Sequence, residues 1–251
     1  CSYLEKIVFN TDLLTSISPS AFKGCLLLRE ITLPSSLNSI DNTAFQGVVS
    51  LEIKGDIQLI PSYSFSNCTS LIQVILNTPQ LKSIESYAFE GCLSLTQITI
   101  PSSVQTIKRH AFLGVKSLTI KGNIQFIPSS AFQNCSSLTE ILFDTNTITS
   151  FKSNAFDGCA SLNNIIIPPT VHTIEYAVFK ECKSITNIII PSSITSIPSS
   201  MFLKCESLEK VTIPSSVTSI SGTVFQGIKK LTIEGNIQHI PNSSFRNCSQ
   251  L

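Results

Sequence analysis

Phenylalanine recurs along the chain at a nearly constant interval, and this spacing constrains the fold more than any other feature of the sequence. The intervals are 20, 23 or 24 residues, and the series is Phe22, Phe45, Phe65, Phe89, Phe112, Phe132, Phe156, Phe179, Phe202, Phe225 and Phe245. A segment of this length cannot bury its own apolar face, whereas stacked copies bury one continuous core. The sequence therefore predicts one solenoid over residues 1–251, with about eleven units of 20–24 residues, cut within a unit at both ends.

Each unit repeats the same succession of short elements. Apolar and polar residues alternate in stretches such as LTQITI at 95–100, which predicts a strand with one buried face. A proline such as Pro101 ends the strand, because proline cannot donate to a ladder. A second extended piece such as VQTI at 104–107 follows, and the A-F-x-G-C segment has room for one helical turn. The predicted class is α/β, with a continuous parallel sheet and, on the other sides, short extended segments and single helical turns.

The pattern IPSSVTSI…FxGCxSLTxIxIP resembles the BspA-like leucine-rich repeats of surface proteins from bacteria and parasitic protists, and the resemblance covers essentially the whole chain. It implies a leucine-rich-repeat horseshoe with the parallel sheet on its concave face. It also implies a non-enzymatic protein-binding module that acts in adhesion or in recognition of a host or partner protein. Three 20-residue units depart from the pattern and carry Gly55, Gly122 or Gly235 where Pro-Ser is usual.

The nine cysteines share one register. Eight lie three residues after a repeat phenylalanine, and Cys1 fits the same position of a unit whose phenylalanine is cut off. Zinc sites usually pair cysteines a few residues apart, and here the spacings are 20 or more. The strand spacing of about 4.8 Å would allow a disulfide such as Cys159–Cys182. The odd number of cysteines and their continuous column instead favour cysteine as a small buried hydrophobic residue. In the short units, Val48, Val115 and Ile228 occupy the same position and fill a similar space.

The residue before the cysteine position is Gly or Asn in nine of eleven units. Both residue types tolerate a left-handed backbone at a turn, so Asn is first a turn residue there. The N-x-S/T pattern nevertheless makes four asparagines candidates for glycosylation, namely Asn67, Asn134, Asn242 and Asn247.

Composition excludes several classes of function. Hydrophobic residues make up 42% and charged residues 13% of the chain, which suits a packed core, and the net charge of +1 provides no basic field for nucleic acid. No apolar run approaches the roughly 18 residues of a membrane span. His110, His172 and His239 lie in different units at different offsets, as exposed variable positions would. No cofactor, metal or catalytic site is predicted, and we do not expect an enzyme.

The strand alternation predicts which side chains point outward from the sheet. In order they are Glu30/Thr32, Ser50/Glu52, Gln73/Ile75, Gln97/Thr99, Ser117/Thr119, Glu140/Leu142, Asn164/Ile166, Asn187/Ile189, Lys210/Thr212 and Lys230/Thr232. Leu142, Ile166 and Ile189 form an apolar stripe over three consecutive coils. An apolar patch with a polar rim is typical of an interaction surface. The candidate partner-binding residues are therefore Glu140, Leu142, Asn164, Ile166, Asn187 and Ile189, although the strand preference of β-branched residues would explain the stripe equally well.

Two functions fit this pattern. The first is the ectodomain of a cell-surface or extracellular adhesin, whose partner would be a host-cell or extracellular-matrix protein. The second is a cytoplasmic leucine-rich-repeat scaffold or regulatory subunit, which the unpaired cysteines suit slightly better. Acidic outward positions (Glu30 and Glu52) come early and basic ones (Lys210 and Lys230) come late, a distribution that either orients a partner or arises by chance. A signal peptide or membrane segment in the full-length gene would exclude the scaffold.

Overall fold

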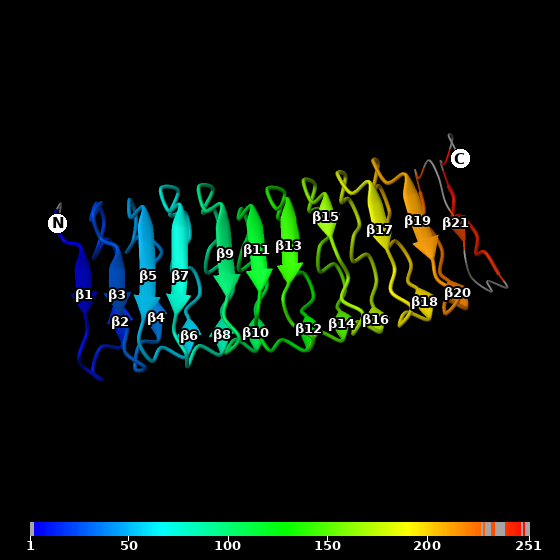
Figure 1. Cartoon of the computed structure of the whole chain (residues 1–251). Coiled ribbons are helices and arrows are strands. Elements are labelled where there is room, and N and C mark those ends of the chain that lie inside the picture. Colours follow the sequence, from blue (N-terminus) through cyan, green and yellow to red (C-terminus); the bar gives the residue numbers. More distant parts are fainter. Residues whose placement is uncertain (1–2, 227, 229–231, 234–238, 247, 249–251) are drawn as a thin grey trace. The chain divides into compact units, whose positions relative to one another are not determined.

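A computed structural model describes residues 3–226, 228, 232–233, 239–246 and 248 of the chain. It contains two compact units, residues 1–124 and 125–251, and each unit is a stack of coils with one long and one short line of strands (Figure 1). The predicted leucine-rich-repeat type of fold is confirmed within each unit. That residues 1–251 form a single solenoid stays a prediction.

In the first unit, six parallel strands form one ladder in chain order. They are β1 (Lys6–Val8), β3 (Glu30–Thr32), β5 (Ser50–Lys54), β7 (Gln73–Asn77), β9 (Gln97–Ile100) and β11 (Ser117–Ile120). Their burial alternates, as in β7, where Val74 and Leu76 are buried and the residues between them are exposed. As predicted, every second side chain of the ladder therefore points into the core.

In the second unit, the corresponding strands form two separate ladders. They are β13 (Glu140–Phe143), β15 (Asn164–Ile165), β17 (Asn187–Ile189), β19 (Lys210–Ile213) and β21 (Thr232–Ile233). β13 pairs with β15, and β17 pairs with β19 and then β21, but β15 and β17 are the end strands of different sheets. The prediction of a continuous sheet is therefore wrong at this step, where β15 is only two residues long.

A second line of short strands is present, as predicted. In the first unit these are β2 (Ser16–Ile17), β4 (Ser39–Ile40), β6 (Leu59–Ile60), β8 (Ser83–Ile84) and β10 (Thr106–Ile107). In the second unit they are β12 (Phe126–Ile127), β14 (Ser150–Phe151), β16 (Thr173–Ile174), β18 (Ser196–Ile197) and β20 (Ser219–Ile220). The line also forms in coils such as those of β6 and β12, which lack the proline before it. β2 pairs only with β4, while β6, β8 and β10 form another ladder, so this line is interrupted between β4 and β6.

The segments around the repeat phenylalanines are successive turns, and the described part of the chain contains no helix. Most coils have two left-handed residues here, as Tyr87 (φ 61°) and Gly91 (φ 69°) show on either side of Phe89. The Phe89 N–H donates to the Ala111 carbonyl in the next coil at 2.8 Å, whereas the Glu90 N–H bonds back to Tyr87 at 3.1 Å. A helix needs consecutive right-handed residues and internal hydrogen bonds. The predicted single helical turns are therefore wrong, because alternate amides cross-link neighbouring coils instead.

The repeat phenylalanines form a stacked column inside each unit. Nine of the eleven are buried, and only Phe22 and Phe245, at the two ends of the series, are half-buried. Neighbouring rings are nearly parallel, with centroids 5.1 Å apart for Phe65–Phe89 and 5.2 Å apart for Phe132–Phe156. Offset-stacked rings at this distance add to the stability that their area burial provides.

The cysteine column lies beside the phenylalanines. All eight described cysteines are free thiols, and seven of them are buried. The Cys92 thiol donates to the Phe65 carbonyl of the preceding coil at 3.0 Å, and the Cys159 thiol donates to that of Phe132 at 3.1 Å. The interpretation of a structural column is confirmed for the described cysteines, and the alternative Cys159–Cys182 disulfide is not formed in this structure.

Burial also settles how these thiols behave chemically. Burial raises the pKa of Cys68 and of Cys205 to about 12, because a thiolate would lose its hydration there. Val48 and Val115 take the cysteine position in the short units and are fully buried. A position that accepts either thiol or isopropyl is a packing position, and a thiol held protonated is a poor nucleophile.

Candidate protein-interaction site

The predicted apolar stripe is present on the outward face of the second unit. Leu142, Ile166 and Ile189 are 44%, 76% and 72% exposed. Their strand neighbours Ile141, Ile165 and Ile188 are buried, so the alternation fixes the direction in which the stripe points. The β13–β15 register sets Leu142 and Ile166 beside each other on adjacent coils, and Ile189 lies on the outward face of the next coil.

Polar side chains border the stripe, as predicted. Glu140 and Asn164 lie opposite each other in the β13–β15 ladder, and the Asn164 Nδ2 lies 3.4 Å from the Glu140 Oε1. Asn187 lies opposite Lys210 in the β17–β19 ladder, and both are exposed. The rim thus runs from a carboxylate through two amides to an ammonium group.

The break in the sheet falls inside the stripe. β15 ends at Ile165, one residue before Ile166, and β17 has a ladder partner only on its β19 side. Ile166 and Ile189, which are among the most exposed large aliphatic side chains of the described residues, therefore lie on either side of the unpaired edge of β17. Unpaired strand edges and exposed apolar groups are both features that associate with other chains.

The outward face of the first unit is different, because its charges are paired. Glu30 and Glu52 lie opposite each other in the ladder. The Lys54 Nζ lies 2.7 Å from Glu30 Oε2 and 3.4 Å from Glu52 Oε2, and Lys6 pairs with the other oxygen of Glu30. The hydrogen bonds from Lys54 and then Lys6 hold the pKa of Glu30 below its usual value. The negative charges of Glu30 and Glu52, which would orient a partner in one of the two interpretations of their distribution, are therefore neutralised by Lys6 and Lys54. Of the basic positions predicted at the other end, Lys230 lies outside the described residues.

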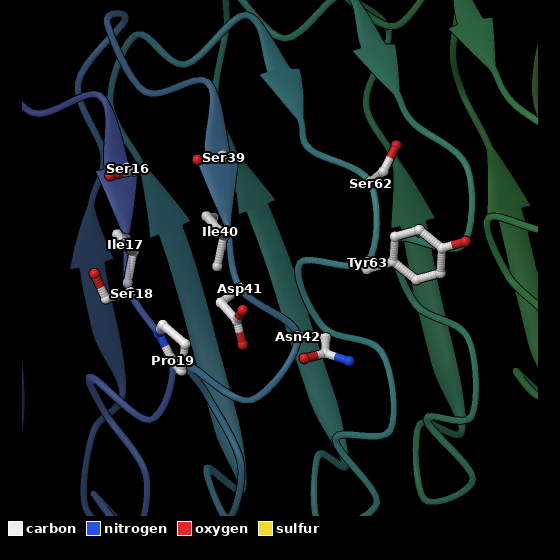
Figure 2. A pocket seen from close by; sticks show the side chains of 10 residues that line it. All are labelled: Ser16, Ile17, Ser18, Pro19, Ser39, Ile40, Asp41, Asn42, Ser62 and Tyr63. Atoms are coloured by element: carbon white, nitrogen blue, oxygen red, sulfur yellow. The ribbon is translucent and has the colours of Figure 1, made fainter.

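A hollow of about 600 Å³ in the first unit was not predicted. It is lined by Ser16, Ile17, Ser18, Pro19, Ser39, Ile40, Asp41, Asn42, Ser62 and Tyr63, and Figure 2 shows Tyr63 across the hollow from the β2–β4 residues. We call it the Tyr63 hollow. The sequence did contain a signal for it. Tyr63 lies two positions before a repeat phenylalanine, and several other coils have serine at this position, namely Ser20, Ser130 and Ser200.

The glycosylation candidates have the predicted turn geometry where it is described. Asn67 and Asn134 are exposed and left-handed, with φ of 58° and 61°. A Cβ added to Gly91 in the next coil would lie 2.5 Å from the Asn67 Oδ1, so a larger residue there would require the Asn67 side chain to move. Asn242 is exposed, Asn247 lies outside the described residues, and glycosylation at all four stays a prediction.

The histidines do not form a site. His110 was predicted to be exposed, but it is only 8% exposed, and its ring lies 5.2 Å from that of Tyr87. Its contacts include the Tyr87 ring and the Arg109 guanidinium, whose Nε donates to the His110 Nε2 at 2.9 Å. Among the described residues, no group of three His, Cys, Asp or Glu side chains could hold a metal ion.

Comparison with known proteins identifies the repeat. Six copies of the BspA type leucine-rich repeat region match residues 1–119 and 125–251. The chain belongs to the BspA-type leucine-rich repeat family. These repeats are a protein-interaction module, and the fold that carries them is typically a non-enzymatic scaffold. No curated protein matches the chain.

Solved leucine-rich repeat structures resemble the chain at low identity. TLR13, in a TLR13-ssRNA13 complex, is 17% identical over 92% of this chain and 39% of that one, with a TM-score of 0.51. A leucine-rich cell surface protein from Faecalibacterium prausnitzii is 23% identical over 100% of this chain and 79% of its own, with a TM-score of 0.40. The pneumococcal vaccine antigen PcpA is 16% identical over 98% of this chain and 76% of its own, with a TM-score of 0.49. At these identities the likeness to TLR13 supports the fold alone.

Among the described residues, no helix has the length and apolar character needed to span a membrane.

Proposed function

We propose that this leucine-rich repeat chain is a non-enzymatic adhesion or recognition module that binds a protein through the apolar stripe of its second unit. The observation that carries the proposal is the exposure of Leu142, Ile166 and Ile189 on consecutive coils. Burying three exposed aliphatic side chains releases water from a continuous apolar surface, and such central apolar anchors dominate binding energy.

The polar rim would set the orientation of the partner. Glu140 is acidic and Lys210 is basic, with the amides of Asn164 and Asn187 between them. The Asn187 amide has no hydrogen bond to other residues in the described part of the chain, so a partner can satisfy it without breaking an internal bond. Complementary charge at the rim mainly affects association rate and specificity.

We place the module at the cell surface or outside the cell, where its partner would be a host-cell or extracellular-matrix protein. The support is the membership of the BspA-type family together with the four N-x-S/T sequences. Nucleic acid is not the expected partner, because the net charge is +1 and charged residues make up only 13% of the chain.

The experiment replaces Ile166 and Ile189 together with Lys and measures binding to immobilised collagen, laminin and fibronectin. The two charges fall in the centre of the stripe, and we expect the affinity for the bound matrix protein to fall by about 2 kcal/mol or more. Both side chains are over two-thirds exposed, so the free energy of unfolding should change by less than about 1 kcal/mol.

The matched control is Ile75→Lys with Thr99→Lys. These two residues are also exposed outward side chains on adjacent coils, but they lie in the first unit. The control should retain binding. Equal loss in both double variants would indicate a general charge effect, and full binding by the Ile166/Ile189 variant would show that the stripe reflects strand preference alone.

A further inference from the structure

The Tyr63 hollow combines an aromatic platform with a carboxylate, an amide and several hydroxyl groups. It lies wholly in the first unit, between the β2–β4 ladder and the turn that follows β6. Its volume of about 600 Å³ is within the usual range for small-ligand sites. The hollow is independent of the apolar stripe, which lies in the second unit.

The hollow exists because the short strands are interrupted here. Ile40 of β4 and Ile60 of β6 are the equivalent buried residues of consecutive coils, and they are only 20 residues apart because the unit between them is a short one. β4 and β6 belong to different ladders, so no backbone pairing closes the space between them. The side chains of Asp41, Asn42 and Tyr63 border this space (Figure 2).

Tyr63 ends an aromatic stack. Its ring is parallel to that of Tyr87, with centroids 5.0 Å apart, and Tyr87 in turn contacts His110. The corresponding residue in the preceding coil is Thr43, so the second face of Tyr63 has no aromatic neighbour in the described part of the chain. Tyr63 is 45% exposed, which leaves much of the ring available to a ligand.

The backbone at Tyr63 is left-handed, as it is at the same position of most other coils. Its φ is 62°, a left-handed conformation that is a genuine outlier for a bulky residue. Ser20 and Ser130 hold the same position in other coils at φ of 58° and 56°. The left-handed backbone thus belongs to the repeat, and the exposed aromatic ring is what distinguishes this coil from those with serine.

Hydrogen-bonding groups face the ring across the hollow. Asp41 Oδ1 accepts hydrogen bonds from the Thr43 N–H at 3.1 Å and the Thr43 hydroxyl at 2.9 Å, which fix the orientation of the carboxylate. Asp41 Oδ2 and the Asn42 amide have no partner among the described residues and are open to a ligand. The exposed hydroxyls of Ser16 and Ser39 lie side by side in the β2–β4 ladder.

We propose that the Tyr63 hollow binds a neutral oligosaccharide. The apolar C–H face of a sugar ring stacks on an aromatic face, while the ring hydroxyls need carboxylate, amide and hydroxyl partners around their edge. Tyr63 supplies the platform, and Asp41 and Asn42 supply a carboxylate oxygen and an amide. The carboxylate of Asp41 is the only charged group that lines the hollow, so sialylated or sulfated sugars are disfavoured.

The test is saturation-transfer NMR followed by titration calorimetry with maltotetraose, cellotetraose, chitotetraose and lacto-N-tetraose, and with 3′-sialyllactose as the acidic probe. At least one neutral tetrasaccharide should bind, and 3′-sialyllactose should bind about tenfold more weakly than it. Tyr63→Ser should weaken binding about tenfold or more, because it removes the platform. Tyr63→Phe should bind within about twofold of the wild type, because the platform remains.

Two further variants complete the experiment. Tyr63→Ser should fold, since serine occupies the same left-handed position at Ser20 and Ser130. Asp41→Asn keeps one oxygen for Thr43 but removes the charged acceptor, and it should weaken binding about tenfold. Tyr176→Ser removes an equally exposed tyrosine of the second unit and should change nothing. No binding of any neutral tetrasaccharide, or unchanged binding by Tyr63→Ser, would overturn the proposal.

Discussion

The two units present different outward surfaces on the same repeated scaffold. In the first unit, Lys6, Glu30, Glu52 and Lys54 form a compact ion-pair network across three adjacent strands. In the second unit, the corresponding region carries exposed Ile166 and Ile189 beside a break in the sheet. The comparison shows that the buried residues of a coil define the scaffold, whereas its outward residues are free to specify a function.

The largest expected effect concerns the scaffold that both units share. Phe89→Ala in the first unit and Phe156→Ala in the second each remove a fully buried ring that stacks on both neighbouring phenylalanines. Each should lower the free energy of unfolding by about 3–5 kcal/mol, measured by urea denaturation. A loss below about 1 kcal/mol at either site would mean that the two units are not built on the same kind of phenylalanine column.

The next prediction tests the buried thiols of the two units at alkaline pH. The pKa of Cys68 and Cys205 is raised to about 12 in the folded protein, above the value of about 8.5 in an unfolded chain. Above pH 8.5 the unfolded chain therefore loses protons that the folded chain retains, and stability falls as pH rises. Each such thiol should remove about 2 kcal/mol between pH 8 and pH 10.

The corresponding variants are Cys68→Val and Cys205→Val, since Val48 occupies the same position in a short unit. Each should reduce the loss of stability between pH 8 and pH 10 relative to the wild type, in urea titrations at both pH values. An unchanged pH dependence would show that the thiol ionises equally in the folded and unfolded chain. Native labelling with a thiol reagent, which should be slow for both cysteines, gives an independent check.

The smallest expected effect concerns the ion pairs of the first unit. The pKa of Glu30 is lowered by its hydrogen bonds to Lys54 and Lys6, so the stability that these bonds provide is present above the unfolded pKa and is lost as pH falls below it. Glu30→Gln should lower the melting temperature slightly at pH 7 and low salt. The difference should shrink below pH 4, where Glu30 is protonated, and at high salt, because the pairs are partly solvent-exposed. A salt-independent difference would indicate a packing role for Glu30 instead.

Much of the fold could be predicted because the repeat determines it residue by residue. The spacing of phenylalanines such as Phe112 and Phe156 predicted the buried column, and the alternation around Ile165 and Ile188 predicted which side chains point outward. The free, buried cysteines followed from their single register. These features depend on local periodicity, which the sequence contains explicitly.

The features that were missed depend on how one coil meets the next. The turn segments were predicted as helical, because the sequence does not show that the Phe89 amide bonds to the next coil. The pairing of Glu30 with Glu52 depends on the ladder register at a short unit, which the pattern within one unit does not specify. The Tyr63 hollow likewise arises from a missing ladder between β4 and β6. Inter-coil hydrogen bonding is long-range in sequence, so a pattern within one unit cannot specify it.

The most direct test of the binding face is site-specific photo-crosslinking. Benzoylphenylalanine would replace Ile166 in one variant and Ile75 in the other, and each would be irradiated with the matrix protein that the wild-type chain binds. Both positions are exposed and outward, but only Ile166 lies in the apolar stripe. Crosslinking from position 166 with little from position 75 is the predicted result. Crosslinking from position 75 alone, or equally from both, would contradict the assignment of binding to the stripe of the second unit.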